Sequence, residues 1–188
     1  MNQVPTPPDA VEEDFLRLDR QLCFSLNAAS RAFGSVYRVL LKELGLTYPQ
    51  YLVMLALWEH GEISVRDLGA RLRLDSGTLS PLLKRLEAAG LVQRERSAQD
   101  ERSVRVHLTE DGGQLRERAL RVPRRIAAAA GFDAAEAAEL RTRLDRLTRA
   151  LDAAAEDEAA LLEDASGARP AAGRGRTPAG RSRPRSAS

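Results

Sequence analysis

The sequence has little that could bind a metal or form a disulfide: one cysteine, Cys23, and two histidines, His60 and His107. One cysteine excludes a disulfide within the chain, and the spacings give no pattern of zinc ligands. The longest apolar run, residues 51–58, is far shorter than the roughly 20 residues that cross a bilayer. The first eight residues have no apolar segment of the kind found in signal peptides. We therefore expect a cytoplasmic protein without metal, cofactor or membrane span.

Aromatic residues are also scarce, at 4% of the 188 residues, whereas alanine and leucine predominate among the apolar ones. This composition favours helices over strands. The formal charge of +2 is unevenly distributed, because residues 166–188 contain six arginines and no acid and leave residues 1–165 at net −4. Within that acidic part, residues 66–105 contain nine Lys or Arg against six Asp or Glu. A local basic segment suits a protein that meets phosphates on one surface, although such excesses also occur on solvated faces.

The apolar periodicity predicts two helices in the first third of the chain. From Phe15 onward, apolar positions recur at spacings of three and four, which indicates a long amphipathic helix over roughly residues 11–44. Thr47 and Gln50 form a capping box that starts a second helix, ending near Trp58.

Short elements with clear boundaries follow. Ser64 and Asp75 cap two short helices, and because a tight turn joins them they predict a helix-turn-helix. The segments 91–96 and 103–108 have the pattern of short strands around a charged turn, residues 97–102, which predicts a wing. The expected fold is therefore mainly α, a winged helix-turn-helix.

The C-terminal part predicts two more helices, from Thr109 to about Ala130 with a kink at Pro123, and from Asp133 to about Glu163. The leucines of the last helix form a narrow stripe of coiled-coil type: Leu140, Leu144, Leu147 and Leu151. The first and the last two helices are more apolar than one small domain can cover, so we expect a homodimer.

The domain boundaries follow from this organisation. We predict a flexible N-terminus over residues 1–10, one winged-helix domain with its dimerisation helices over residues 11–165, and a disordered Arg-rich tail over residues 166–188.

The helix after Asp75 has the character of a DNA-reading helix. Its leucines at helical spacing face the core: Leu79, Leu82, Leu83 and Leu86. The opposite face holds small and polar residues suited to a major groove: Ser76, Gly77, Thr78, Ser80, Pro81, Lys84 and Arg85. In the wing, Arg94, Arg96 and Arg102 are candidates for minor-groove contacts, and Asp100 can pair with Arg102. The alternatives are a solvated helix face and a surface ion pair in a charged loop.

Several of these segments carry a resemblance to a known family. Residues 91–94 and 100–109 resemble the wing signature of MarR-type repressors. Three segments with the sequences LCFSL, AASRA and LTYPQYLVM, at residues 22–26, 28–32 and 46–54, resemble more narrowly the organic hydroperoxide sensors of the OhrR type. The similarity covers roughly residues 12–160.

This resemblance implies a homodimeric repressor that binds a pseudo-palindromic operator duplex and leaves it when an organic hydroperoxide oxidises Cys23. It also implies that Tyr37 and Tyr48 donate hydrogen bonds to the thiolate. On one helix, Cys23 and Tyr37 lie about 21 Å apart along the axis, so they can meet only between two subunits whose first helices cross antiparallel. The later helices contain no second cysteine, which leaves a mixed disulfide with a low-molecular-weight thiol as the reversible product. Asn27 stands where some relatives have a tyrosine.

Two other functions compete with this interpretation. A MarR-type repressor released by a small aromatic ligand would need Cys23 only as a structural residue. A thiol peroxidase would start with the same sulfur chemistry, but the chain lacks an α/β pattern and the basic segment would have no role. We therefore expect no enzyme and no catalytic residues.

Overall fold

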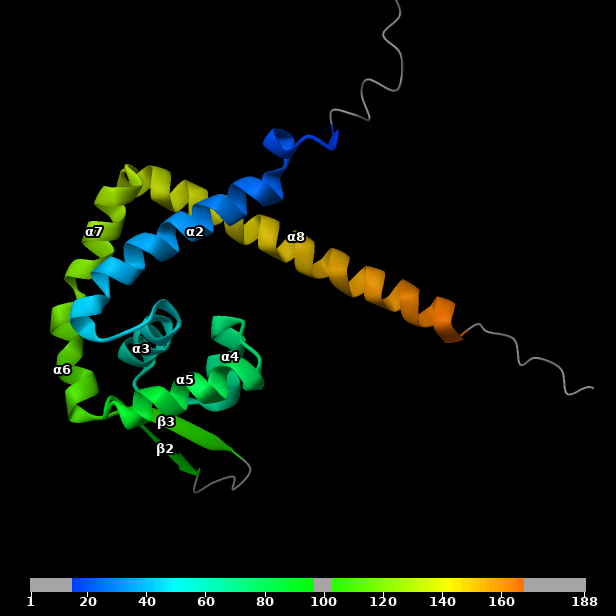
Figure 1. Ribbon diagram of the computed structural model, residues 1–188. Coiled ribbons are helices and arrows are strands. Elements are labelled where there is room, and N and C mark those ends of the chain that lie inside the picture. Colours follow the sequence, from blue (N-terminus) through cyan, green and yellow to red (C-terminus); the bar gives the residue numbers. More distant parts are fainter. Residues whose placement is uncertain (1–14, 97–102, 168–188) are drawn as a thin grey trace, which may run out of the picture. The chain divides into compact units, whose positions relative to one another are not determined.

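The structure is a computed structural model that describes residues 15–96 and 103–167. The chain divides by its internal contacts into two units, residues 1–133 and 134–188, which we take one at a time. Figure 1 shows the elements in their colours along the sequence. In chain order they are η1 (Leu18–Arg20), α2 (Leu22–Leu40), η2 (Lys42–Leu44), α3 (Tyr48–His60), β1 (Ile63–Ser64), α4 (Val65–Leu72), α5 (Ser76–Ala88), β2 (Val92–Arg96), β3 (Val104–Leu108), α6 (Glu110–Ala119), α7 (Arg121–Ala130) and α8 (Ala134–Gly167).

The first helix is shorter than the sequence predicts. A 3-10 turn, η1, precedes it, and Gln21 between them is extended, with φ −83° and ψ 114°. The side-chain amide of Gln21 donates hydrogen bonds to the backbone carbonyls of Phe15 and Arg17, the second at 3.2 Å. Such local side-chain bonds compete with helix propagation, so the prediction of one continuous helix was wrong at this point. At the other end the chain tightens into the 3-10 turn η2 and closes at Gly45.

The helix-turn-helix and the capping residues that define it agree with the sequence. The Ser64 hydroxyl accepts from the Asp67 amide at 3.0 Å, and Thr47 and Gln50 form the predicted capping box of α3. Between α4 and α5 the chain turns so tightly that a Cβ at Gly69 would lie 2.9 Å from the Leu74 carbonyl oxygen. A residue with a side chain would therefore push the two helices apart.

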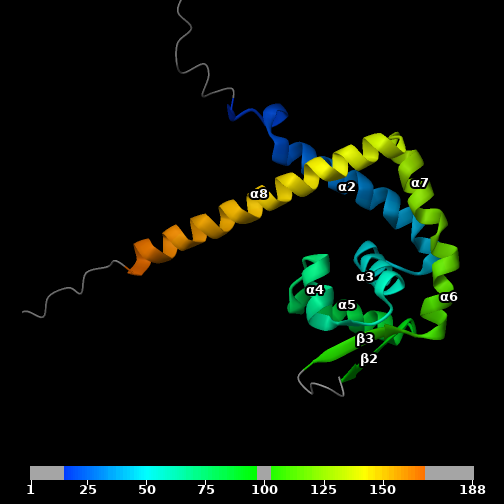
Figure 2. The ribbon, with the colours of Figure 1, turned by 180° about the vertical axis from the view of Figure 1, so that it is seen from behind.

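The wing contains one strand more than the sequence predicts. β3 is the central strand and pairs antiparallel with β2 and with β1, in the order β1-β3-β2. β1 has only two residues, too few for an alternating pattern to be read from sequence. Figures 1 and 2 show α5 alongside β2 and β3 in both views. The predicted turn, residues 97–102 with Asp100 and Arg102, lies outside the described residues, as do residues 1–10 and 168–188.

The start of α6 is packed closely against Gly90 and Leu91, which follow α5. The Thr109 hydroxyl caps α6 and donates to the Gly90 carbonyl at 2.6 Å. A Cβ at Gly112 would lie 2.0 Å from the Leu91 carbonyl oxygen, so only glycine fits there. The Trp58 indole N–H donates to the Gly112 carbonyl at 2.8 Å and fixes the same point to α3.

The predicted kink at Pro123 is a break between two helices. α6 ends at Ala119 and α7 begins at Arg121, because Pro123 has no N–H to donate to the Ala119 carbonyl. In the second unit, α8 runs to Gly167, beyond the predicted end at Glu163. Among the described residues, no helix is both long and apolar enough to cross a membrane.

Candidate nucleic-acid interface and thiol site

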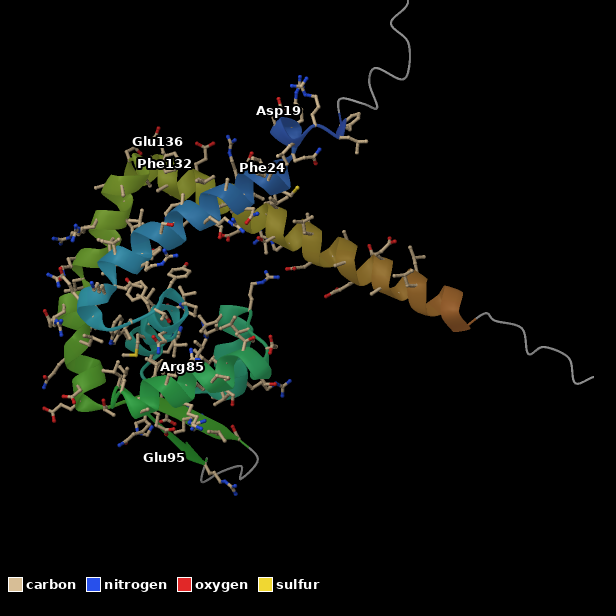
Figure 3. All side chains as sticks on the ribbon, viewed as in Figure 1. Asp19, Phe24, Arg85, Glu95, Phe132 and Glu136 are labelled. Carbon is tan, nitrogen blue, oxygen red and sulfur yellow. The ribbon has the colours of Figure 1, made fainter. Side chains whose placement is uncertain are left out.

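The two faces of α5 divide as the sequence predicts. Leu79, Leu83 and Leu86 are buried almost completely, and Leu82 is 8% exposed. All seven residues of the predicted DNA-reading face are exposed: Ser76, Gly77, Thr78, Ser80, Pro81, Lys84 and Arg85. The core therefore fixes which side of α5 is presented to solvent. Figure 3 labels Arg85 on this helix.

The N-terminus of α5 is held by its own cap. The Asp75 carboxylate accepts from the Thr78 amide and from the Thr78 hydroxyl, each at 2.9 Å. The hydrogen bonds from Thr78 lower the pKa of Asp75, so the cap stays ionised at neutral pH. The Thr78 hydroxyl thus uses its proton within the chain and keeps oxygen lone pairs that can accept a hydrogen bond.

The wing arginines are not equivalent. The Arg94 guanidinium donates to the Glu87 carboxylate at 2.5 and 3.0 Å, so Arg94 is held against the end of α5. Arg96, two residues further along β2, is exposed. Arg105 on β3 pairs with Glu62. Of the two predicted wing contacts that the structure describes, Arg96 is thus exposed to solvent, whereas Arg94 is paired with Glu87.

A polar hollow lies between the reading helix and the wing. Its volume is about 680 Å³, and it is lined by residues of β1, α4, α5, β2 and β3. Three of its lining residues are arginines, Arg66, Arg94 and Arg105, and Ser80 of α5 also contributes. Asp67 also lines the hollow, and Arg94 and Arg105 pair with Glu87 and Glu62, so its charge is mixed. Its arginines and small hydroxyl side chains are of the types that contact sugar-phosphate backbones.

The thiol of Cys23 is accessible. Cys23 is the second residue of α2 and is exposed. Phe24 beside it, labelled in Figure 3, is also 45% exposed. Asn27, one helical turn further on, is exposed as well. Within the described residues, no group of three or more His, Cys, Asp or Glu could hold a metal ion.

The structure brings the two predicted tyrosines together. The ring centroids of Tyr37, on α2, and Tyr48, the first residue of α3, are 4.5 Å apart. Tyr51 continues the aromatic cluster at 6.0 Å from Tyr37, and Trp58 lies 6.2 Å from Tyr51. Burial, followed by the neighbouring Tyr48 and Tyr51, raises the pKa of Tyr37 to about 12. The Tyr37 hydroxyl therefore keeps its proton at neutral pH and can act as a hydrogen-bond donor.

Cys23 does not reach these tyrosines within its own chain. Cys23 and Tyr37 occupy opposite ends of α2, about 21 Å apart along its axis. Within one subunit, the hydroxyls of Tyr37 and Tyr48 are therefore too far from the Cys23 thiol to contact it.

Sequence reasoning missed two residues that organise these surfaces. Glu87 was not singled out, although it and Arg94 are opposite charges on either side of the turn at Gly90. Trp58 packs against the core, and its indole N–H also donates to the Gly112 carbonyl at the start of α6, a contact that was not predicted from the sequence. The charge pattern could have suggested the first contact; nothing local in the sequence indicates the second, which spans 54 residues.

Comparisons with known proteins agree with this architecture. The family described as "Transcriptional regulator SarA/Rot" matches residues 35–118. The organic hydroperoxide resistance transcriptional regulator of Bacillus subtilis is 53% identical over 110 residues, which are 58% of this chain and 75% of that protein. The HTH-type transcriptional regulator MgrA of Staphylococcus aureus is 39% identical over 72% of this chain and 92% of its own length.

A solved structure extends the similarity to the fold. Reduced AbfR bound to DNA, a protein of Staphylococcus epidermidis, matches with a TM-score of 0.64 and 37% identity, over 75% of this chain and 96% of that one. The exposed polar face of α5, the three-stranded wing and these similarities agree with one another. The chain therefore belongs to the MarR/SarA-like family of winged-helix proteins and is a DNA-binding transcriptional regulator.

Proposed function

We propose that this chain is a homodimeric repressor that leaves its operator when an organic hydroperoxide oxidises Cys23. The observation that carries the proposal is that Cys23 lies at one end of α2, whereas Tyr37, which contacts Tyr48 of α3, lies at the other end. Two copies of α2 that cross antiparallel would bring Cys23 of one subunit to the tyrosine pair of the other. The similarity to the Bacillus subtilis organic hydroperoxide resistance regulator supports the same chemistry.

Exposed apolar side chains support the dimer. Leu22 and Phe24 on α2 are 61% and 45% exposed, and Leu151 on α8 is 59% exposed. A single subunit leaves this apolar surface in water, and a second copy can cover it. A two-fold dimer presents two copies of α5, so its operator would be a pseudo-palindromic duplex. Because its target is DNA, we place the protein in the cytoplasm.

The proposed chemistry is stoichiometric and needs no cofactor. The Cys23 thiolate attacks the terminal oxygen of the hydroperoxide, so that an S–O bond forms and the O–O bond breaks. The sulfur becomes a sulfenic acid, and the alkoxide takes up a proton and leaves as the alcohol. A low-molecular-weight thiol then condenses with the sulfenic acid, forming a mixed disulfide and releasing water. We propose no catalytic turnover, so the protein acts as a switch and not as a peroxidase.

The decisive experiment is operator binding by the wild type and Cys23→Ser, with and without an alkyl hydroperoxide. We expect both proteins to bind the operator equally in the absence of peroxide, because Cys23 lies at the start of α2 and away from α5. Only the wild type should be released by peroxide. Normal release of Cys23→Ser would remove the thiol from the mechanism.

One observation favours a second candidate, release by a small aromatic ligand. A hollow of about 420 Å³ lies between α3 and the junction of α6 and α7. Tyr51, Trp58 and Leu55 provide apolar walls, and Arg116 could pair with a carboxylate. Release of DNA by an aromatic carboxylate that persists in Cys23→Ser would favour this function over peroxide sensing.

A further inference from the structure

We infer that Glu87 and Arg94 are positioning residues, which lock the wing against the DNA-reading helix so that both reach DNA in a fixed relation. Arg94 of β2 donates from Nε and Nη2 to one oxygen of Glu87, on the last turn of α5, at 3.0 and 2.5 Å. Figure 3 labels Arg85 on α5 and Glu95 on β2, which are near neighbours of the pair in sequence. The inference rests on DNA binding and is independent of the peroxide response.

The pairing of the strands places Arg94 on the helix side of the sheet. Side chains alternate along a strand, so Arg94 shares its face with Val92, which is 1% exposed. Its partner across the ladder is Val106, which is fully buried. Arg94 therefore lies at the edge of the core between sheet and helix, and its guanidinium extends toward α5.

The environment of the pair strengthens it. The Arg94 and Glu87 side chains are 31% and 36% exposed, so both are partly removed from water. A charge-assisted contact with two donors on one carboxylate fixes direction as well as distance. The Arg94 hydrogen bond lowers the pKa of Glu87, which keeps the carboxylate ionised at neutral pH. The two partners therefore carry opposite charges at the pH of a DNA-binding measurement.

The pair adds a directional contact to the apolar packing between α5 and β2. Leu86 of α5 and Val92 of β2 are buried beneath it. Apolar contacts do not fix the direction of a strand as well as a geometrically specific ion pair does. Loss of the pair would let β2, with Arg96 and the wing beyond it, tilt relative to α5. Specific binding would weaken, because α5 and the wing would no longer fit the major and minor grooves of DNA at the same time.

The competing role for Arg94 is a direct phosphate contact, because Arg94 also lines the hollow between α5 and the wing. The two roles predict opposite results at Glu87. If only electrostatics matter, removal of the Glu87 charge beside DNA tightens binding. If Glu87 positions Arg94, its removal weakens specific binding.

The test measures fluorescence anisotropy of a duplex that the wild-type protein has enriched from a random pool, at several KCl concentrations. We compare Glu87→Gln, Arg94→Gln and the double variant. Each single variant should weaken specific binding by about tenfold, and the double variant should be no weaker than either single one, because one contact is lost in all three. The slope of log Kd against log[KCl] should stay at the wild-type value, since no phosphate contact is lost.

Arg96→Gln is the matched control, on the same face of the same strand. As an exposed residue, Arg96 should show the behaviour of a phosphate contact, with a slope shallower by about 0.9 per contact. A charge-exchange variant combines Glu87→Arg with Arg94→Glu. It should recover the binding that either of these two single substitutions loses. Thermal melts would verify that each variant is folded.

Three results would overturn the inference. Glu87→Gln could leave binding unchanged or tighter, Arg94→Gln could reduce the slope as Arg96→Gln does, or the exchange variant could bind no better than its single parents. A wild-type protein that enriches no duplex would instead overturn DNA binding itself, and the positioning role with it.

Discussion

The Tyr37 hydroxyl offers a direct test of how the thiol is activated. The perturbation is Tyr37→Phe, which removes one donor and leaves the ring contact with Tyr48. A hydrogen bond to a charged acceptor contributes about 1.5–3 kcal/mol, which corresponds to a roughly 10- to 100-fold smaller thiolate population at neutral pH. The remaining thiolate becomes more nucleophilic and offsets about half of that loss on a logarithmic scale. The net fall in the rate of Cys23 oxidation should therefore be about 3- to 10-fold.

The assay is a single-turnover reaction with an alkyl hydroperoxide, quenched at intervals and followed by intact mass. Burial raises the pKa of Tyr37 to about 12, so the wild-type hydroxyl stays protonated throughout the neutral range and the comparison is not complicated by its titration. Tyr51→Phe is the matched control, because Tyr51 belongs to the same aromatic cluster, with its ring centroid 6.0 Å from that of Tyr37. Tyr51→Phe should oxidise at the wild-type rate.

Mixed dimers then decide which subunit supplies the hydroxyl. In a dimer of Tyr37→Phe with Cys23→Ser, the one remaining thiol faces an intact Tyr37 of its partner and should react at the wild-type rate. In a dimer of wild type with the double variant Cys23→Ser/Tyr37→Phe, the remaining thiol faces a partner without the hydroxyl and should react slowly. The reverse pair of rates would refute the antiparallel arrangement of α2, and equal rates in both dimers would refute the role of Tyr37.

Three further predictions follow from the structure. Lys84→Ala should weaken operator binding and make its salt dependence shallower by about 0.9 per contact, measured by anisotropy over a KCl series, because Lys84 is exposed on the DNA-reading face; an unchanged slope would show that α5 docks differently. Gly112→Ala should lower the free energy of unfolding by about 3 kcal/mol in urea titrations, because its Cβ would meet the Leu91 carbonyl oxygen at 2.0 Å. Gly113→Ala, with nothing within 4 Å, should be neutral or more stable, and equal losses in both variants would contradict the close contact at Gly112. Oxidation with a small thiol present should give a mixed disulfide on Cys23 that dithiothreitol reverses, whereas excess peroxide alone should give irreversible over-oxidation, both read by intact mass; a covalent dimer on a non-reducing gel would contradict this chemistry.

The sequence determined the helix-turn-helix and its exposed face. The leucines of α5 recur at helical spacing, and capping residues such as Ser64 and Asp75 act on amides three residues away. Both signals are local, so the period and the caps are sufficient to define the element and the side that faces solvent. The seven small or polar residues on the exposed face of α5 were predicted in this way, and the resemblance to a sensor family predicted the roles of Cys23, Tyr37 and Tyr48.

The tertiary structure decided how distant residues are paired. Arg94 was predicted as a DNA contact from its place in a charged strand, but its engagement with Glu87 depends on how β2 folds back along α5. The contact of Tyr37 with Tyr48, the strand β1 and the hydrogen bond from Trp58 to Gly112 likewise join segments with no shared local pattern. An arginine in a sequence has the same charge whether it faces a phosphate or a carboxylate. Only the packing of helix against sheet brings a particular partner within hydrogen-bond distance.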